Sequence, residues 1–203
     1  MAKKALIALL DYGMGNLRSV EKALEHEGAR VIVTNDPRAV QKADKLVVPG
    51  VGAFSQAMQA LRRFHLEGAI LEAVDSGKPY LGLCLGLQIL FEGSQEGSAK
   101  GLGLLKGKVV RFKKARKIPH MGWNTLRVRK GSRLLMGVKP EDHFYFVHSF
   151  YAAPSDAACV AATTSYEETF CSAVERGSLM ATQFHPEKSQ AAGLRILKNF
   201  VRL

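Results

Sequence analysis

Apolar runs and amphipathic segments alternate through the first half of the chain, and this alternation limits its fold more than any other feature. Strand-like runs at 5–10, 30–34, 45–48 and 79–83 are separated by segments whose apolar residues recur at helical spacing, as at Leu17, Val20, Ala23 and Leu24. Neighbouring parallel strands need a long crossover, which a helix supplies. The pattern predicts an α/β fold with a parallel core sheet.

The second half is organised differently. Strand-like runs at 104–112, 125–129, 143–151, 158–166, 169–175 and 179–184 are mostly joined by short turns, and a helix is predicted over 191–201. Short turns favour antiparallel strands added to the parallel core. Because no repeat or linker interrupts the 203 residues, we expect one domain covering 1–203.

Composition excludes several classes of protein. No apolar stretch approaches the roughly 20 residues of a membrane-spanning helix. The three cysteines, Cys84, Cys159 and Cys171, are odd in number and widely spaced, which argues against a disulfide scaffold or a zinc site. We expect a cytoplasmic protein that holds no metal and contacts no membrane.

The formal net charge is +11, and part of this excess is concentrated in one segment that we call the basic segment. Its twelve residues, 106–117, contain no acidic residue and carry Lys106, Lys108, Arg111, Lys113, Lys114, Arg116 and Lys117. Such a segment either solvates the surface or meets an anionic partner. A surface for stacking nucleic-acid bases needs interleaved aromatic residues, and only Phe112 lies within the segment. We therefore expect an acidic protein partner or a gain in solubility, and no nucleic acid.

The most informative motif is Gly82-Leu83-Cys84-Leu85-Gly86, between an apolar strand and a helix predicted over 85–91. The spacing G-x-C-x-G is the cysteine version of the nucleophile elbow, a sharp turn that lifts the nucleophile clear of the sheet. A lone cysteine is more often a core residue, but flanking glycines at a strand–helix junction favour a thiolate nucleophile at the helix N-terminus. The Leu85 amide is then positioned to stabilise an oxyanion.

A cysteine nucleophile needs a base, and His185 is the best of six histidines. It follows the last strand, so it shares an edge of the sheet with Cys84, whereas His26 and His65 are expected on the surface of helices. Glu187, two residues on, can orient the imidazole. Alone, the His-Pro-Glu sequence would indicate a solvated turn; beside the elbow it predicts a triad.

A third segment, Pro49-Gly50-Val51-Gly52, also follows a strand. It is either a simple turn or a flexible segment that turns backbone N–H groups toward the nucleophile as the second oxyanion donor. Glycine suits the second function, because such amides often require unusual backbone angles.

These three segments, in this order and at these distances, resemble the class I (triad) glutamine amidotransferases over essentially the whole chain. The resemblance implies their three-layer, flavodoxin-like fold, and no cofactor. It implies that Cys84 attacks the side-chain amide of L-glutamine and forms a thioester. His185, held by Glu187, would protonate the departing ammonia and then activate water.

The same resemblance implies a binding site for the substrate. Gln88, one helical turn after the cysteine, resembles the residue that binds glutamine. The backbone at Ser149 and Phe150 resembles the segment that receives its α-amino and carboxylate groups. Many relatives carry a histidine where this chain has Leu87, a position without a catalytic role.

Within this family, five segments are similar to the glutaminase subunits of imidazole glycerol phosphate synthases, from histidine biosynthesis: DYGMGN at 11–16, PGVGAF at 49–54, PHMGWN at 119–124, YFVHSFY at 145–151 and HPEKS at 185–189. The similarity implies a heterodimer with a (β/α)8-barrel synthase, which receives the ammonia. The segment 119–124 is expected to be an exposed loop with Trp123 as interface anchor. The partner interface or ammonia passage would contain His120, Trp123, Asn124, Tyr145 and Lys188.

Two alternatives stay open. The glutaminase subunit of pyridoxal phosphate synthase is the nearest, but it carries a Gly-Gly-Glu-Ser-type oxyanion segment where this chain has Pro-Gly-Val-Gly. A cysteine peptidase or chaperone-like hydrolase with the same elbow is the alternative from another class. Release of ammonia from free glutamine without peptide cleavage distinguishes a glutaminase from both hydrolases.

Overall fold

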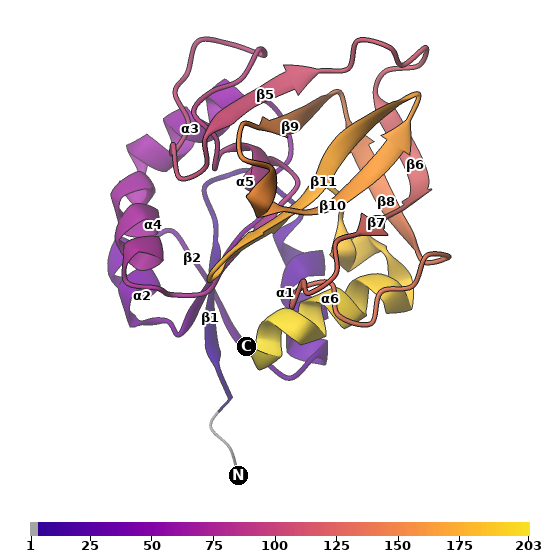
Figure 1. Ribbon diagram of the computed structural model, residues 1–203. Helices are drawn as coiled ribbons and strands as arrows, with labels where there is room; N and C mark the ends of the chain where they lie inside the picture. The colour runs from indigo at the N-terminus through magenta and orange to yellow at the C-terminus, as the bar shows by residue number, and fades with distance from the viewer. Residues whose placement is uncertain (1–3) are drawn as a thin grey trace.

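A ten-stranded mixed sheet runs through the computed structural model, which describes residues 4–203 (Figure 1). Its first half is parallel, in the order β2-β1-β3-β4-β12. These strands are β2 (Arg30–Thr34), β1 (Leu6–Leu10), β3 (Lys45–Val48), β4 (Tyr80–Leu83) and β12 (Leu179–Thr182). The predicted parallel core is confirmed, and β12 comes from the far end of the chain to lie beside β4.

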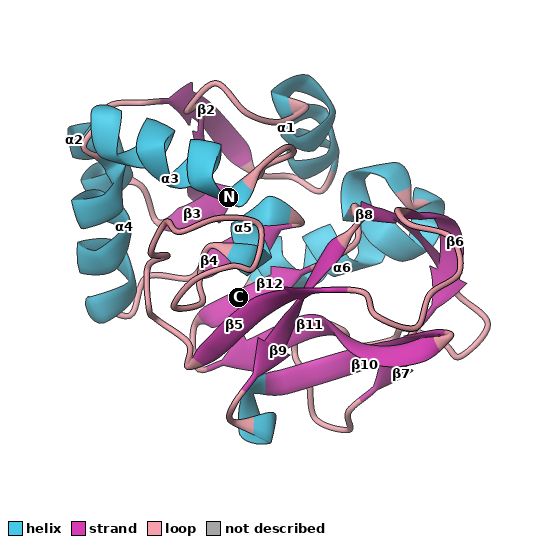
Figure 2. Cartoon of the chain, turned by 90° about the horizontal axis from the view of Figure 1, so that it is seen from above, coloured by secondary structure: helices cyan, strands magenta, loops and turns pink. Residues whose placement is uncertain are grey.

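Helices cover both faces of this core (Figure 2). One face carries α1 (Leu17–His26) and α6 (Gln190–Arg202), and the other carries α2 (Pro37–Lys42), α3 (Phe54–Arg63) and α4 (Leu66–Asp75). Side chains alternate along a strand, so Ile7 and Leu9 pack in the core beneath α1 and α6, whereas Ala8 and Leu10 pack in the core beneath the other helices. The three-layer fold is therefore confirmed.

The antiparallel strands extend the sheet beyond β12. They are β11 (Glu168–Arg176), β10 (Val160–Tyr166) and β7 (Arg127–Val128), with β9 (Phe150–Pro154) pairing both β11 and β5 (Gly107–Arg111). A separate two-stranded antiparallel sheet consists of β6 (His120–Thr125) and β8 (His143–His148). Short helical turns lie at η1 (Ala157–Cys159), α5 (Leu85–Gln88) and η2 (Pro186–Lys188).

The sequence-based boundaries were wrong in four places. The helix after Cys84 ends at Gln88 rather than at residue 91, because the following loop takes its carbonyls: the Leu102 and Leu105 amides donate to Ile89 and Leu90 over 2.8 and 2.9 Å. Helix α4 was not predicted, and His65 lies at its N-cap with a left-handed backbone (φ +56°) rather than within a helix.

The other two errors concern the site. Residues 119–124, expected as a loop, mostly form strand β6, because every residue from His120 to Thr125 finds a partner on β8. The single strand predicted over 143–151 is broken at Ser149 into β8 and β9, which belong to different sheets.

Candidate active site

Cys84 lies at a sharp turn between β4 and α5, with φ +54° and ψ −102°. A positive φ is uncommon for a residue with a side chain and marks a strained backbone. The flanking glycines permit this turn through close packing. A Cβ on Gly86 would lie 1.9 Å from the Val48 carbonyl oxygen, and one on Gly82 would lie 2.3 Å from the Gly86 carbonyl oxygen. The turn therefore has the geometry of a nucleophile elbow.

His185 reaches the same edge of the sheet from β12. The Cys84 amide donates to the Thr182 carbonyl over 2.7 Å, which fixes the two strand ends side by side. His185 Nδ1 lies 2.8 Å from Glu187 Oε1, and both side chains are almost fully buried. Within residues 4–203, His185 Nε2 makes no hydrogen bond, and the Cys84 side chain is close enough to shift the pKa of His185. The three predicted triad residues are thus adjacent.

The side chains of Cys84 and Glu187 favour the charged form of His185. Burial lowers the pKa of His185, but the proximity of Cys84 and the hydrogen bond and charge of Glu187 outweigh burial and raise the pKa above its ordinary value. A raised pKa favours the imidazolium at neutral pH. The site is therefore suited to a thiolate–imidazolium pair, with Glu187 stabilising the cation through Nδ1.

The segment 49–52 lies against the elbow, but one of its carbonyls faces the expected oxyanion donor. The Leu85 amide donates to the Gly50 carbonyl oxygen over 3.3 Å. A Cβ at Gly50 would lie 2.3 Å from the Tyr12 hydroxyl, which itself donates to the Pro49 carbonyl over 2.6 Å. Tyr12 was not singled out from the sequence, because a buried tyrosine near a turn is usually a packing residue.

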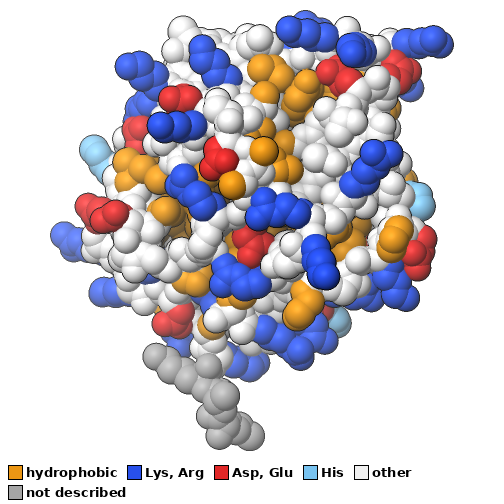
Figure 3. All heavy atoms as spheres, in the orientation of Figure 1, with side chains coloured by type: hydrophobic (Ala, Val, Ile, Leu, Met, Phe, Trp, Pro, Cys, Tyr) orange, Lys and Arg blue, Asp and Glu red, His pale blue; other side chains and the backbone are white. Residues whose placement is uncertain are grey.

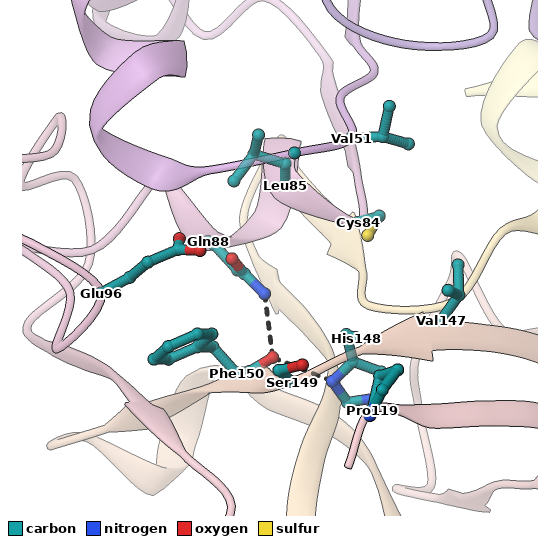
Figure 4. Close-up of a pocket in the computed structure, with 11 residues that line it drawn as sticks. Val51, Cys84, Leu85, Gln88, Glu96, Pro119, Val147, His148, Ser149 and Phe150 are labelled. Atoms are coloured by element: carbon teal, nitrogen blue, oxygen red, sulfur yellow. Dashed lines mark hydrogen bonds between the residues drawn. The ribbon is translucent and has the colours of Figure 1, made fainter.

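A cavity of about 380 Å³ opens beside Cys84, within the size range of small-molecule sites (Figure 4). Gln88 donates from Nε2 to the Phe150 carbonyl over 3.0 Å and to Gln183 Oε1 over 3.1 Å. Six of the seven residues predicted for oxyanion or substrate binding line this cavity, and the seventh, Gly50, contacts Leu85 through its carbonyl. The lining contains Val51, Gly52, Cys84, Leu85, Gln88, Glu96, Pro119, Val147, His148, Ser149 and Phe150.

Glu96 is the one acidic side chain in this lining, and sequence reasoning missed it. Its Oε2 accepts the Phe54 amide over 2.8 Å, which holds the carboxylate at the cavity wall. It lies in a turn-rich segment without periodicity, so no local signal separates it from a solvated surface residue. Its proximity to Gln88 depends on the long-range path of the chain (Figure 4).

Three of the five predicted interface residues form an exposed group beside the triad. The Trp123 and Tyr145 rings lie 5.9 Å apart, and the Lys188 ammonium lies 5.7 Å from the Tyr145 ring centroid. Trp123 is 48% exposed, and Met121 on the same face is 60% exposed. The His185 amide donates to the Tyr145 carbonyl over 2.9 Å, so this group is joined directly to the base.

His120, predicted for the partner interface or the ammonia passage, lies inside the protein. Alternate residues of a strand face opposite sides, so Met121 and Trp123 face outward while His120 turns inward. His120 is 3% exposed and its ring is stacked on the rings of Phe146 and Tyr166. Asn124, on the inward side as well, is half-buried. His120 therefore cannot touch a partner at this surface.

The described part of the chain, 4–203, contains no group of His, Cys, Asp and Glu side chains arranged to hold a metal ion. In the same residues, no helix has the length and apolar character needed to cross a membrane.

Comparisons with known proteins agree with this geometry. Residues 8–203 match the family model described as "Glutamine amidotransferase class-I". The chain is 51% identical over 203 residues to "Imidazole glycerol phosphate synthase subunit HisH" of Syntrophotalea carbinolica, covering 96% of this chain and 98% of that protein. It is 52% identical over 196 residues to the protein of the same name from Aquifex aeolicus, covering 96% and 95%.

The fold is also similar to a solved structure, that of PurLQS from Thermotoga maritima. The TM-score is 0.78 with 18% sequence identity, and the match covers 98% of this chain and 99% of the other. At this identity the likeness concerns the fold alone.

Proposed function

The chain belongs to the class I glutamine amidotransferases, and we propose that it is the glutaminase subunit of an imidazole glycerol phosphate synthase. The observation that carries this proposal is the strained elbow of Cys84 beside a buried His185–Glu187 pair. Relatives about half identical over nearly their whole length carry the name of that subunit. The alternative of a pyridoxal phosphate synthase subunit has no comparable observation in its favour.

The reaction follows from the positions of the three side chains. The Cys84 thiolate attacks the side-chain carboxamide carbon of glutamine, and the Leu85 amide stabilises the oxyanion. The His185 imidazolium gives its Nε2 proton to the leaving amine, so ammonia departs and a thioester remains. Water then attacks the thioester while His185 accepts its proton, which releases glutamate and restores the thiolate. Glu187 keeps the Nδ1 proton facing itself throughout.

The cavity lining accounts for recognition of the rest of the substrate. Gln88 uses Nε2 for two carbonyl-type acceptors, which turns its Oε1 away from Phe150 (Figure 4). Oε1 of Gln88 and the Glu96 carboxylate are then acceptors for the α-ammonium group of glutamine. The backbone at Ser149 and Phe150 would receive the α-carboxylate.

The exposed group of Met121, Trp123, Tyr145 and Lys188 is the proposed docking surface for a (β/α)8-barrel synthase, in a heterodimer. Aromatic and methionine side chains are enriched in interface centres. Pro119, just before β6, and Val147 of β8 contribute to the wall of the substrate cavity, so ammonia released at Cys84 would leave close to the partner. The basic segment would surround this surface on one side; Figure 3 shows Lys and Arg side chains along the upper rim, near β5 in Figure 1.

Further proposals concern the organisation of the protein. We propose that residues 1–203 act as one amidotransferase domain without cofactor. The three cysteines are free thiols, which fits a reducing cytoplasm, and we propose that the enzyme works there.

The test is glutamate release by the chain co-purified with the barrel subunit of its own organism. The Cys84→Ala complex should lose glutamine hydrolysis, yet it should still make imidazole glycerol phosphate from added ammonia at high pH. Cys159→Ala is the matched control, because Cys159 is a buried core thiol whose loss should leave glutaminase activity intact. Glutamine hydrolysis that survives in Cys84→Ala would reject the assignment.

A further inference from the structure

A series of hydrogen bonds runs from the β6–β8 sheet, which carries the proposed docking surface, to the substrate cavity through two buried histidines. His120 Nε2 lies 3.3 Å from the Asn124 amide nitrogen, and His120 Nδ1 lies 3.0 Å from His148 Nε2. His148 Nδ1 lies 2.8 Å from the Phe150 carbonyl oxygen. That oxygen also accepts from Gln88 Nε2 over 3.0 Å. The mechanism described above uses neither histidine.

The direction of every bond in this chain can be deduced. A carbonyl oxygen only accepts, so His148 Nδ1 must carry the proton that points to Phe150. Nε2 of a neutral His148 is then an acceptor, and His120 Nδ1 must donate to it. His120 Nε2 is left as the acceptor for Asn124. The asparagine agrees, because its Nδ2 also donates to the Ser165 carbonyl and its Oδ1 accepts the Thr125 amide.

Both imidazoles lie in surroundings that keep them neutral. His120 and His148 are 3% and 6% exposed. The His120 ring lies 4.0 Å from the Tyr166 ring and 4.8 Å from the Phe146 ring, measured between centroids. Burial lowers the pKa of His120 to about 4, and burial, together with the nearby His120 and His185, lowers that of His148 to about 3. The deduced directions therefore hold at neutral pH.

This series of hydrogen bonds ends at the Phe150 carbonyl oxygen, which also accepts from Gln88, the residue proposed to bind the substrate. Phe150 opens β9 just after the break at Ser149, and its carbonyl receives a donor from each side, Gln88 and His148. With this oxygen fixed, only one orientation of the Gln88 carboxamide satisfies both it and Gln183. The opposite orientation would place oxygen against oxygen and turn an N–H toward the substrate ammonium.

We propose that His120 and His148 form a relay of neutral imidazoles, both protonated at Nδ1, which fixes the Phe150 carbonyl and thereby the Gln88 carboxamide that binds glutamine. Both histidines are positioning residues, since neither touches the substrate amide. The proposal rests on the proposed glutaminase function for its kinetic consequence, but the protonation pattern is independent of any activity.

The protonation pattern can be read directly from the unmodified protein. In protein labelled with ¹⁵N in its imidazoles, two-bond ¹H–¹⁵N spectra at pH 7 should show the rings of His120 and His148 as neutral Nδ1–H tautomers. Spectra of His120→Asn and His148→Asn assign them. An Nε2–H tautomer or an imidazolium at His148 would overturn the relay, whether or not the protein hydrolyses glutamine.

Two substitutions at His148 separate positioning from packing. Asparagine places an N–H near the position of Nδ1 and retains the donor to Phe150, whereas glutamine reaches the position of Nε2 and loses that donor. In the complex with its synthase, His148→Gln should raise the KM for glutamine by about two- to tenfold, the worth of one neutral hydrogen bond. Its kcat should stay within about twofold. His148→Asn keeps the donor to Phe150 and should therefore raise the KM less than His148→Gln does.

Thermal unfolding shows whether each variant is folded at the assay temperature. Equal changes in both variants, or a loss of kcat without a change of KM, would leave only a packing role and overturn the proposal. Failure of the proposed function is recognised separately, because the wild-type complex would then release no glutamate from glutamine.

Discussion

The Leu85 amide donates to the carbonyl oxygen of Gly50, with 3.3 Å between nitrogen and oxygen. This amide follows the nucleophile and is the donor expected to stabilise the oxyanion, so the described conformation has it occupied. The bond is at the long end for N–H···O, and it can be exchanged at small cost. Gly52, with φ +103°, gives the segment the freedom to turn its peptide bonds.

We therefore predict that the chain alone is a poor glutaminase and that its partner stimulates it. Removing one oxyanion donor lowers rates by roughly 10²–10³-fold in other enzymes, which is ample for regulation. Ammonia release should be measured for the chain alone, for the complex, and for the complex with a ligand of the synthase. Equal kcat in all three states would contradict gating. Stimulation that requires the ligand would place the switch in segment 49–52 rather than in complex formation.

A second prediction ranks the members of the triad. His185→Ala removes the group that moves both protons, an effect of about 10²–10⁴-fold. Glu187→Ala only loosens its orientation, so His185→Ala should be at least as damaging as Glu187→Ala. The measurement is kcat/KM for glutamine on variants shown to be folded, and the reverse ranking would mean that the two roles are assigned wrongly.

The charge of Glu187 predicts a change in pH dependence. Glu187 helps to raise the pKa of His185, so Glu187→Gln should lower that pKa while keeping an oxygen near Nδ1. The imidazolium would then lose its proton at lower pH, so the alkaline limb of the kcat/KM profile should shift to lower pH. A limb that does not move, or moves up, would exclude Glu187 as the stabilising charge.

Local patterns were sufficient to predict the sharp turn at Cys84 and the His185–Glu187 pair at the same edge of the sheet. Gly82 and Gly86 indicate the turn, because backbone atoms lie too close to them for a Cβ to fit. The strand before His185 places this histidine at the same edge of the sheet. These signals are local in sequence and need only the rule that parallel strands end together.

Features that depend on contacts between segments far apart in the sequence could not be predicted. The inward turn of His120 depends on its register with His148, and a shift by one residue would exchange the faces of β6. Glu96 reaches the cavity only because the chain returns beside Phe54. The Gly50 carbonyl points to the Leu85 amide, which lies far away in the sequence. Because glycine permits several peptide orientations, the local sequence does not predict this direction.

Glu96 gives a fourth prediction. As the proposed acceptor for the substrate ammonium, its carboxylate makes a charged hydrogen bond, and Glu96→Gln should raise the KM for glutamine about tenfold or more with a smaller change in kcat. Glutamine retains an oxygen for the Phe54 amide, so the loop should stay in place. The control substrate is 4-carbamoylbutanoate, which is glutamine without its amino group. Wild type and Glu96→Gln should hydrolyse it equally slowly; an equal penalty on both substrates would contradict ammonium binding.

The last prediction concerns the basic segment. Its backbone is anchored, because the amides of Lys113 and Lys114 donate to Glu168 and that of Arg116 donates to Glu167. Its cationic side chains are exposed and, within residues 4–203, none takes part in an ion pair. Cations held in place without partners are suited to steer an acidic protein toward the proposed docking surface.

A matched pair of double variants tests this steering. Replacing Lys113 and Lys114 by glutamine should lower the association rate with the barrel subunit. It should also make that rate less dependent on ionic strength, because salt screens the attraction between exposed charges that lie more than about 8 Å apart at 0.15 M salt. Replacing Arg38 and Lys42 removes the same charge from α2, which lies away from β5 in Figures 1 and 2, and should change little. Stopped-flow association at several salt concentrations gives both slopes. Identical slopes for the two variants would contradict steering and leave solubility as the function of the segment, whereas a slope reduced only by the first variant would locate the acidic surface of the partner beside β5.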